Sequence, residues 1–212
     1  MTGENRPVGA FRGYVLAGGA SSRFGSDKAR AVLGGETVLA RMRDLTASVA
    51  GDVQVIAAAG RYPELRAATV PDRWPGQGPL GGIITALAAT HHSGSACEWN
   101  LIVSCDMPFL THQWLRYMTE QALASGAEVM VPASEHGLEP LCACWRTASL
   151  VKLQGAFDDE VRKVTDAMKR LRMEVLDETH WKRFDTAGRL FWNMNTPQDY
   201  EEAMRIWRTE QM

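Results

Sequence analysis

Short apolar segments alternate with helical segments along this chain, and this rhythm limits how it can fold more than any other feature. Strands are predicted at residues 13–16, 53–57, 68–70, 99–104, 128–131, 141–145 and 173–176. Apolar residues at helical spacing predict helices at 38–49, 80–87, 114–122, 158–171 and 197–207. The apolar run at 99–104 is typical of a strand buried on both faces of a parallel sheet. The sequence therefore predicts an α/β fold with three layers, α/β/α, around a mostly parallel sheet.

The length of 212 residues suits one compact domain, because domains usually contain roughly 100–200 residues. We expect a flexible leader over residues 1–12, which are polar and contain Pro7, followed by a single domain over 13–212. The leader has no apolar core, so it does not read as a signal peptide. No apolar stretch approaches the ~18 residues of a membrane span. These features predict a cytoplasmic protein that does not contact a membrane.

Charge and cysteine content exclude other classes of protein. The net charge is −2, and no basic run predicts a nucleic-acid surface. The four cysteines are Cys97, Cys105, Cys142 and Cys144, and they form no C-x-x-C pair or zinc-site spacing. We expect them to be reduced, structural residues, with Cys142 and Cys144 on one face of a buried strand.

A glycine-rich loop, LAGGASSRFGSDK, runs from Leu16 to Lys28 directly after the first predicted strand. Ligands of open α/β sheets bind at the carboxyl ends of the strands. Glycines let backbone N–H groups approach a phosphate there, and Arg23 and Lys28 add two positive charges. The glycine spacing matches neither a P-loop nor the G-x-G-x-x-G fingerprint of dinucleotide-binding proteins. The loop predicts a site for a nucleoside triphosphate; the alternative is a plain glycine turn with solvated charges.

The pattern L-A-G-G-x-S-x-R-x-G-x-D-K in this loop resembles the signature of the molybdenum cofactor guanylyltransferases. The resemblance spans about residues 13 to 207 and implies the Rossmann-like nucleotide-diphospho-sugar transferase fold of the wider nucleotidyltransferase superfamily. It also implies a nucleotide-binding set made of Leu16, Ala17, Gly18, Gly19 and Lys28. In the family, the lysine neutralises the phosphates.

A second segment, from Pro71-Asp72 to the turn that begins at Gly78, follows the third predicted strand. Glycine and proline there predict a tight turn into a helix. The resemblance implies that Asp72 and Gly78 help to form the base-binding pocket. A carboxylate at position 72 suits guanine, because it can accept hydrogen bonds from the ring N–H and the exocyclic amino group.

The segment Cys105-Asp106-Met107-Pro108 places a carboxylate at the end of an apolar strand. Such a carboxylate is costly to bury unless it is paired or bound to a metal. Mg²⁺ prefers one or two carboxylates together with substrate phosphates and waters. We therefore expect Asp106 to be a magnesium ligand and a nucleotide contact, as the resemblance also implies; the alternative is an acid near the start of a helix.

Two asparagines with period 2, Asn193 and Asn195, precede a helix that Thr196 is expected to cap and Pro197 to begin. In an extended segment both amides face one side, where they can bind phosphate oxygens or a metal-bound water. The resemblance implies that this segment returns to the active site. A helix entrance alone explains the threonine and the proline but not both asparagines.

Two other stretches resemble the family less fully. Residues 139–143 match its substrate-side strand, without an assigned role for any residue. Family members also carry an asparagine in the loop after the second strand, where this chain has residues 57–61, AAAGR. The contact of that asparagine is therefore missing, supplied by backbone, or replaced by Arg61.

Together these features predict a magnesium-dependent nucleotidyltransferase in which Arg23, Lys28 and Asp106 are catalytic. The resemblance implies that GMP passes from GTP to molybdopterin carrying molybdenum, and that pyrophosphate leaves. It also leaves room for transient contacts with other cofactor-biosynthesis proteins.

Alternative functions remain open at this point. Related enzymes use CTP or another phosphorylated acceptor, and the cytidylyl relatives have L-A-A-G at the start of the loop. Gly18 has no Cβ, which leaves room for a purine and favours GTP. A binding protein without catalytic activity is disfavoured by Lys28, Asp106 and Asn195, because binding alone needs no metal at the α-phosphate. The glycine spacing disfavours a dehydrogenase.

Overall fold

A computed structural model describes residues 10–18 and 27–210, with backbone alone for residues 66, 67 and 210. Its main sheet has the strand order β10-β7-β9-β6-β1-β4-β5, with β8 beside β7. The bounds of these strands are β1 (Phe11–Leu16), β4 (Val53–Ala57), β5 (Thr69–Pro71), β6 (Trp99–Ser104), β7 (Val129–Ser134), β8 (Gly137–Leu138), β9 (Cys142–Arg146) and β10 (Met173–Leu176). Strand β9 is antiparallel to β6 and β7, whereas β10–β7, β6–β1, β1–β4 and β4–β5 are parallel pairs. The prediction of a mostly parallel sheet is confirmed.

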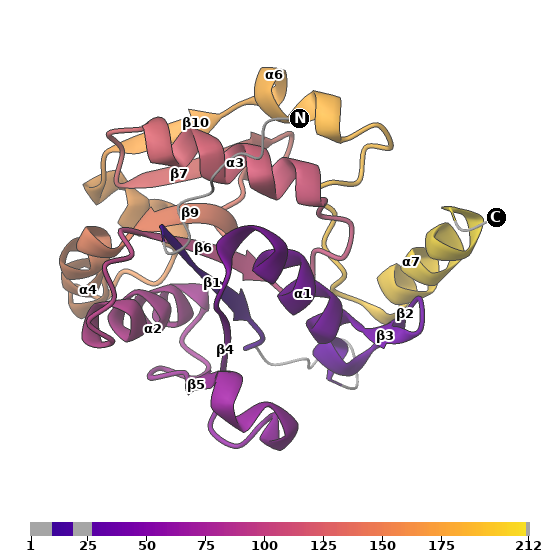
Figure 1. The fold of residues 1–212 in the computed structure, drawn as a ribbon, viewed down its shortest axis with the longest axis horizontal. Coiled ribbons are helices and arrows are strands. Elements are labelled where there is room, and N and C mark those ends of the chain that lie inside the picture. The colour runs from indigo at the N-terminus through magenta and orange to yellow at the C-terminus, as the bar shows by residue number, and fades with distance from the viewer. Residues whose placement is uncertain (1–9, 19–26, 211–212) are drawn as a thin grey trace, which may run out of the picture.

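Helices cover both faces of this sheet, which confirms the three-layer α/β/α architecture (Figure 1). On one face lie α1 (Val38–Ala50) and α3 (His112–Ala124), and on the other α2 (Pro79–His92) and α4 (Leu150–Asp158). Strand β1 serves both layers, because side chains alternate along a strand. Val15 packs with α1 and α3, whereas Tyr14 and Leu16 pack with α2.

Short elements complete the chain. They are η1 (Lys28–Arg30), β2 (Val32–Leu33), β3 (Glu36–Thr37), η2 (Pro63–Ala68), η3 (Thr147–Ser149), α5 (Val164–Ala167), η4 (Met168–Arg170), α6 (Glu178–Trp181) and η5 (Lys182–Phe184). Strand β1 begins at Phe11, so the last two residues of the expected leader belong to the sheet, while residues 1–9 lie outside the described ranges. All four cysteines are buried with free thiols, and Cys142 and Cys144 share one core cluster, as expected. None of the helices in the described ranges is both long and apolar enough to cross a membrane.

The predicted helix over 158–171 is wrong, because α4 ends at Asp158 and α5 begins only at Val164. The chain leaves α4 through Glu160, which has a φ of 63°. The Glu160 N–H donates to the Phe157 carbonyl, and the Val161 N–H donates to the Ala156 carbonyl. This is the Schellman pattern, in which a left-handed residue ends a helix. Glycine usually occupies that position, so glutamate concealed the end of the helix.

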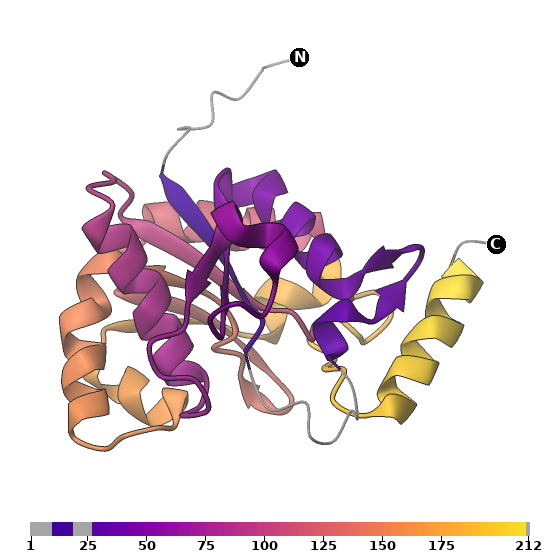
Figure 2. The same cartoon turned by 90° about the horizontal axis from the view of Figure 1, so that it is seen from below.

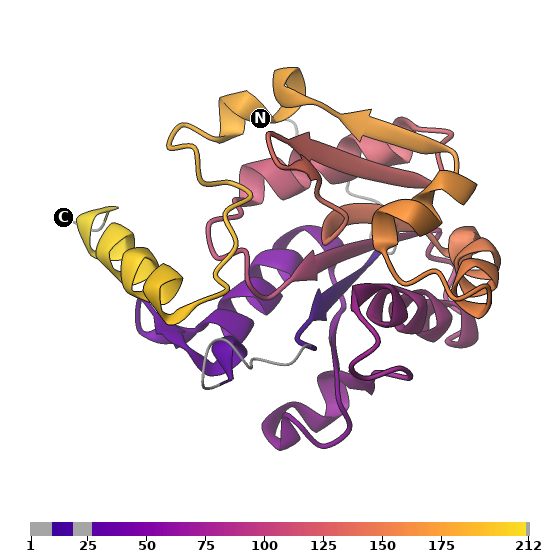
Figure 3. The same ribbon diagram turned by 180° about the vertical axis from the view of Figure 1, so that it is seen from behind.

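The C-terminal helix, α7 (Pro197–Glu210), lies beyond the β2–β3 hairpin at one side of the molecule (Figures 2 and 3). Its start agrees with the prediction, since the Thr196 hydroxyl accepts a hydrogen bond from the Asp199 N–H at 3.1 Å. The Tyr200 hydroxyl donates to the Val32 carbonyl at 2.9 Å. The Arg41 guanidinium lies 3.8 Å from the ring centroid of Trp207. The hairpin and α1 therefore hold this helix.

Gly34 in the hairpin makes room for α7. Its φ is +65°, and a Cβ placed there would lie 2.1 Å from Nε1 of Trp207. The neighbouring Gly35 has a φ of +90°, but a Cβ placed there would have no atom within 4 Å in the part of the chain that the structure describes. Both glycines have a positive φ, but only Gly34 lies against Trp207. Substitutions at the two positions therefore distinguish the cost of backbone strain from the cost of crowding α7.

We expect Gly34→Ala to destabilise the protein by about 1–3 kcal/mol more than Gly35→Ala, because only the first crowds Trp207. Urea unfolding of both variants measures the difference, and limited proteolysis should show earlier cleavage of α7 in Gly34→Ala. Equal unfolding free energies for the two variants would show that α7 does not rest on Gly34.

Candidate active site

The candidate site lies at the carboxyl ends of β1, β4, β5 and β6. The register pairs Leu16 with both Ile56 and Ser104, so these strands end at the same level. The Cys105 N–H donates to the Leu16 carbonyl at 3.1 Å, and the Asp72 N–H donates to the Ala57 carbonyl at 2.7 Å. The segments that the sequence singled out after separate strands therefore meet at one edge, as in other open α/β sheets.

Lys28, Asp106 and Asn195 form the centre of this site. The Lys28 ammonium lies 2.5 Å from Oδ2 of Asp106 and 3.4 Å from Oδ1 of Asn195. Only 20% of the Lys28 side chain and 13% of the Asp106 side chain are exposed. The Met194 N–H donates to the Asp106 carbonyl at 2.8 Å, which fixes the asparagine segment beside the end of β6. Three predicted site residues are thus brought together.

The second carboxylate oxygen of Asp106 is buried and has no hydrogen-bond partner among residues 10–18 and 27–210. Buried polar atoms nearly always have a hydrogen-bond partner, so this oxygen is a candidate contact for a ligand. A carboxylate oxygen is a ligand type that Mg²⁺ prefers, and this ion usually takes few protein ligands beside substrate phosphates. No group of three or more histidine, cysteine or acidic residues suited to a metal occurs in the described part of the chain. The residues present therefore fit a magnesium ion shared with a bound phosphate group.

Asp72 and Gly18 face each other across the ends of β1 and β5. Oδ1 of Asp72 accepts hydrogen bonds from the Trp74 N–H at 3.0 Å and the Thr85 hydroxyl at 3.3 Å. A Cβ placed on Gly18 would lie 3.8 Å from Oδ2 of Asp72, which is ordinary van der Waals contact. The two bonds to Oδ1 hold the carboxylate in place, with Oδ2 on the side of Gly18.

The other predicted nucleotide contacts differ in their surroundings. Leu16 and Ala17 are 7% and 3% exposed, so backbone groups are what they can offer a ligand. Gly78 precedes α2 with a φ of +89°, and a Cβ there would lie 3.8 Å from the Arg162 carbonyl. Gly19 and Arg23 lie outside the described residues.

Arg61 does not take the place of the family asparagine as a free cation. Its Nε donates to Oδ2 of Asp27 at 3.1 Å, and the Tyr62 hydroxyl donates to Oδ1 of Asp27 at 3.2 Å. Of the alternatives left by the sequence, replacement by Arg61 is therefore disfavoured. This contact was not predicted from the sequence, because its two partners are 34 positions apart.

A cavity of about 360 Å³ adjoins Asp106 through Met107. Its walls come from several elements: Pro79, Met107, Leu138, Glu139, Pro140, Leu141, Arg162, Lys163, Val164, Thr165 and Asn193. The two predicted asparagines therefore lie in different surroundings, because Asn193 lines this cavity whereas Asn195 contacts Lys28. Arg162 and Lys163 were missed because the sequence placed them inside a helix.

Glu139 is the buried carboxylate of this cavity, at 8% exposure. Its Oε1 accepts a hydrogen bond from the Ser134 hydroxyl at 2.6 Å. Burial raises the pKa of Glu139 above its ordinary value, and the charge of Asp106 acts in the same direction, against the Ser134 hydrogen bond. A carboxyl group whose ionised form is disfavoured therefore stands beside the centre of the site.

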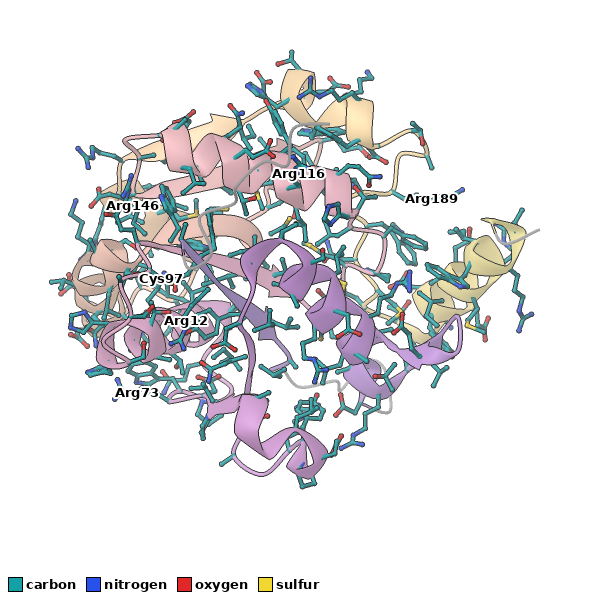
Figure 4. All side chains as sticks on the ribbon, in the orientation of Figure 1. Arg12, Arg73, Cys97, Arg116, Arg146 and Arg189 are labelled. Atoms are coloured by element: carbon teal, nitrogen blue, oxygen red, sulfur yellow. The ribbon has the colours of Figure 1, made fainter. Side chains whose placement is uncertain are left out.

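The opposite edge of the sheet carries paired charges. Arg12 lies 3.1 Å from Asp52, and Arg146 lies 2.7 Å from Glu98. Figure 4 labels both arginines on the side of the molecule away from α7. The carboxylates of these pairs, Asp52 and Glu98, are 65% and 74% exposed, and ion pairs open to solvent contribute little to stability. The Asp106 side chain, in contrast, is only 13% exposed.

Comparison with known proteins shows the family and the fold of this chain. A family model described as the MobA-like NTP transferase domain matches residues 13–174. A "Probable molybdenum cofactor guanylyltransferase" of Pelotomaculum thermopropionicum is 33% identical over 193 residues, which are 90% of each chain. A "Molybdenum cofactor guanylyltransferase" of Desulfosudis oleivorans is 30% identical over 92% of this chain and 94% of the relative. The crystal structure of "Molybdopterin-guanine dinucleotide biosynthesis protein A" from Archaeoglobus fulgidus shares the fold, with a TM-score of 0.78 at 22% identity over 95% of this chain and 100% of that one.

The pH dependence of stability tests the environment of Glu139. Its folded-state pKa lies above the ordinary value of 4.5, so the folded state holds this proton more tightly than the unfolded state. The contribution of Glu139 to the free energy of unfolding is fully present below pH 4.5 and is lost as the pH rises through the folded-state pKa. We expect Glu139→Gln to melt at a higher temperature than wild type at pH 8, and the advantage to shrink towards pH 4.5.

The matched control is Glu135→Gln, since the Glu135 side chain is 85% exposed. Its melting temperature should follow wild type at every pH. A Glu139→Gln curve parallel to wild type from pH 4.5 to 8 would contradict the raised pKa.

Proposed function

Because this chain belongs to the MobA-like NTP transferase family, we propose that it transfers GMP from GTP to molybdopterin that carries molybdenum. The observation that carries this proposal is the contact of the Lys28 ammonium with the largely enclosed carboxylate of Asp106, one oxygen of which is buried and has no hydrogen-bond partner among the described residues. A triphosphate needs cations at its phosphates, and a nucleotidyl transfer needs charge stabilisation at the α-phosphorus. The names of the relatives support the choice of guanine and of the acceptor.

The proposed reaction requires no nucleophilic side chain. A phosphate oxygen of the acceptor attacks the α-phosphorus, the bond from that phosphorus to the bridging β-oxygen breaks, and pyrophosphate leaves with the electron pair. Lys28 offsets charge on the leaving pyrophosphate, and Asn195 beside it offers an amide to a phosphate oxygen. Asp106 would hold Mg²⁺, which when bound supplies Lewis-acid stabilisation of phosphate oxygens. Arg23 adds a second cation in this proposal.

The guanine base is proposed to lie between Gly18 and Asp72. Oδ2 of Asp72, on the side of Gly18, can accept hydrogen bonds from the ring N–H and the amino group of guanine. The absence of a Cβ at Gly18 provides the space for a purine.

The acceptor is proposed to occupy the cavity beside Met107. Arg162 and Lys163 on its wall suit a phosphorylated ligand, and Asn193 and Glu139 add hydrogen-bonding groups. This placement puts the acceptor phosphate next to Asp106, where the α-phosphorus has to be.

We expect Asp106→Ala to abolish GTP-dependent release of pyrophosphate while the protein remains folded. The variant removes the carboxylate that pairs with Lys28 and that would hold the metal. Pyrophosphate release with molybdopterin and Mg²⁺ measures the effect, and circular dichroism checks the fold. Asp52→Ala, which breaks the exposed pair with Arg12, serves as the control and should keep full activity. Activity of Asp106→Ala near that of wild type would remove Asp106 from the site.

We expect Gly18→Ala to lower the preference for GTP over CTP by about tenfold or more, because a methyl group would enter the space of the purine. The fold should tolerate it, since its Cβ would meet Asp72 only at 3.8 Å. Calorimetric titration of each variant with GTP and with CTP, in the presence of Mg²⁺, gives the ratio of affinities. Gly126→Ala is the control, because a Cβ there meets no atom of the described residues within 4 Å. An unchanged ratio would exclude Gly18 from base selection, and a wild-type preference for CTP would replace GTP in the proposal.

A further inference from the structure

Asp27 and Lys28 are adjacent in the sequence but have separate sets of partners. The Lys28 ammonium contacts Asp106 and Asn195. The Asp27 carboxylate accepts hydrogen bonds from the Arg61 Nε at 3.1 Å, the Tyr62 hydroxyl at 3.2 Å and the Ala29 N–H at 3.2 Å. The aspartate is therefore anchored to the loop after β4, while the lysine faces the site.

Tyr62 connects this anchor to the end of β1. Its side chain is 2% exposed, and its hydroxyl lies 3.4 Å from the Ala17 carbonyl as well as 3.2 Å from Asp27. Burial raises the pKa of Tyr62, and the charge of Asp27 raises it further, so the hydroxyl keeps its proton and acts as a donor. One buried phenol thus contacts residues on both sides, in sequence, of the segment 18–26.

Arg30 provides a second tie between the same two regions. Its guanidinium lies 2.9 Å from the Glu64 carboxylate and donates to the Arg61 carbonyl at 3.3 Å. It also lies 5.4 Å from the ring centroid of Tyr62. Because η1 spans only three residues, ties at Asp27 and at Arg30 fix the backbone of Lys28 between them.

The negative charge of Asp27 also has to be offset if the Lys28 ammonium is to bind an anionic ligand. An unpaired carboxylate next to Lys28 would compete for its ammonium and repel a triphosphate. Burial raises the pKa of Asp27, but the hydrogen bond and charge of Arg61, with the Tyr62 hydroxyl, bring it below the ordinary value. The Asp27 carboxylate is therefore ionised and paired with Arg61. The Lys28 ammonium is then available to Asp106 and to a ligand.

We propose that Tyr62 and Arg61 are positioning residues for the nucleotide, because they hold Asp27 and thereby direct the Lys28 ammonium toward Asp106 and the triphosphate. This inference rests on the proposed function, since it assumes that Lys28 contacts the phosphates. Neither residue needs to touch the nucleotide. Their effect on binding passes through Lys28.

A double-mutant cycle tests this role by calorimetric titration with GTP and Mg²⁺. The proteins are wild type, Tyr62→Phe, Lys28→Met and the double variant. We expect Tyr62→Phe to weaken GTP binding about tenfold, as for loss of a hydrogen bond to a charged group. In the Lys28→Met background the same change should have little effect, because the ammonium that it misplaces is gone. Arg61→Ala should behave like Tyr62→Phe, and Arg61→Lys should recover part of the affinity.

Tyr14→Phe is the matched control for loss of a buried hydroxyl. The Tyr14 hydroxyl bonds to Thr90 at 2.8 Å, away from Lys28. Its melting temperature should fall at least as far as that of Tyr62→Phe, with GTP affinity unchanged. The positioning role is overturned if Tyr62→Phe binds GTP like wild type, or if it weakens binding equally with and without Lys28. If wild type itself binds no GTP, the proposed function fails and the positioning role fails with it.

Discussion

The contact between the Lys28 ammonium and the Asp106 carboxylate is the interaction on which the candidate site depends. Both side chains are largely enclosed, and removing charge from water is costly unless each ion has a close partner. At 2.5 Å the lysine satisfies one oxygen of the aspartate, while the other oxygen has no hydrogen-bond partner in the part of the chain that the structure describes. The site therefore holds a close pair of opposite charges beside a carboxylate oxygen that can contact a further group, which suits the proposed ligand of phosphate groups with a metal ion.

The order of the strands allows distant segments to reach this pair. The parallel strands β1, β4, β5 and β6 all end at the edge where the lysine and aspartate lie. Strand β9 runs the other way, so its beginning, with Glu139 just before it, lies at that same edge. In a purely parallel sheet, only residues that follow a strand would lie at this edge. The antiparallel strand β9 adds residues that precede a strand. The cavity wall next to Asp106 is built in this way.

Much of this arrangement could be predicted from local patterns, and the failures have physical causes. Lys28, Asp106 and Asn195 each follow an apolar strand or precede a well-marked helix. Their placement at one edge of the sheet could therefore be predicted from the sequence. The end of α4 was not readable, because Glu160 adopts the left-handed conformation that glycine usually marks. The partner of Arg61 could not be read either, since its contact with Asp27 depends on how two loops meet in space. Single-residue patterns carry no information of that kind.

The contact between Lys28 and Asn195 joins residues that are 167 positions apart in the sequence. During translation at about 5–20 residues per second, the asparagine follows the lysine out of the ribosome roughly 10–30 s later. Asp106 follows Lys28 by 78 residues, so the lysine and the aspartate are both synthesised before the interval is half over, whereas the Asn195 amide is not. The group of Lys28, Asp106 and Asn195 is thus complete only after every strand of the main sheet, from β1 to β10, has been synthesised.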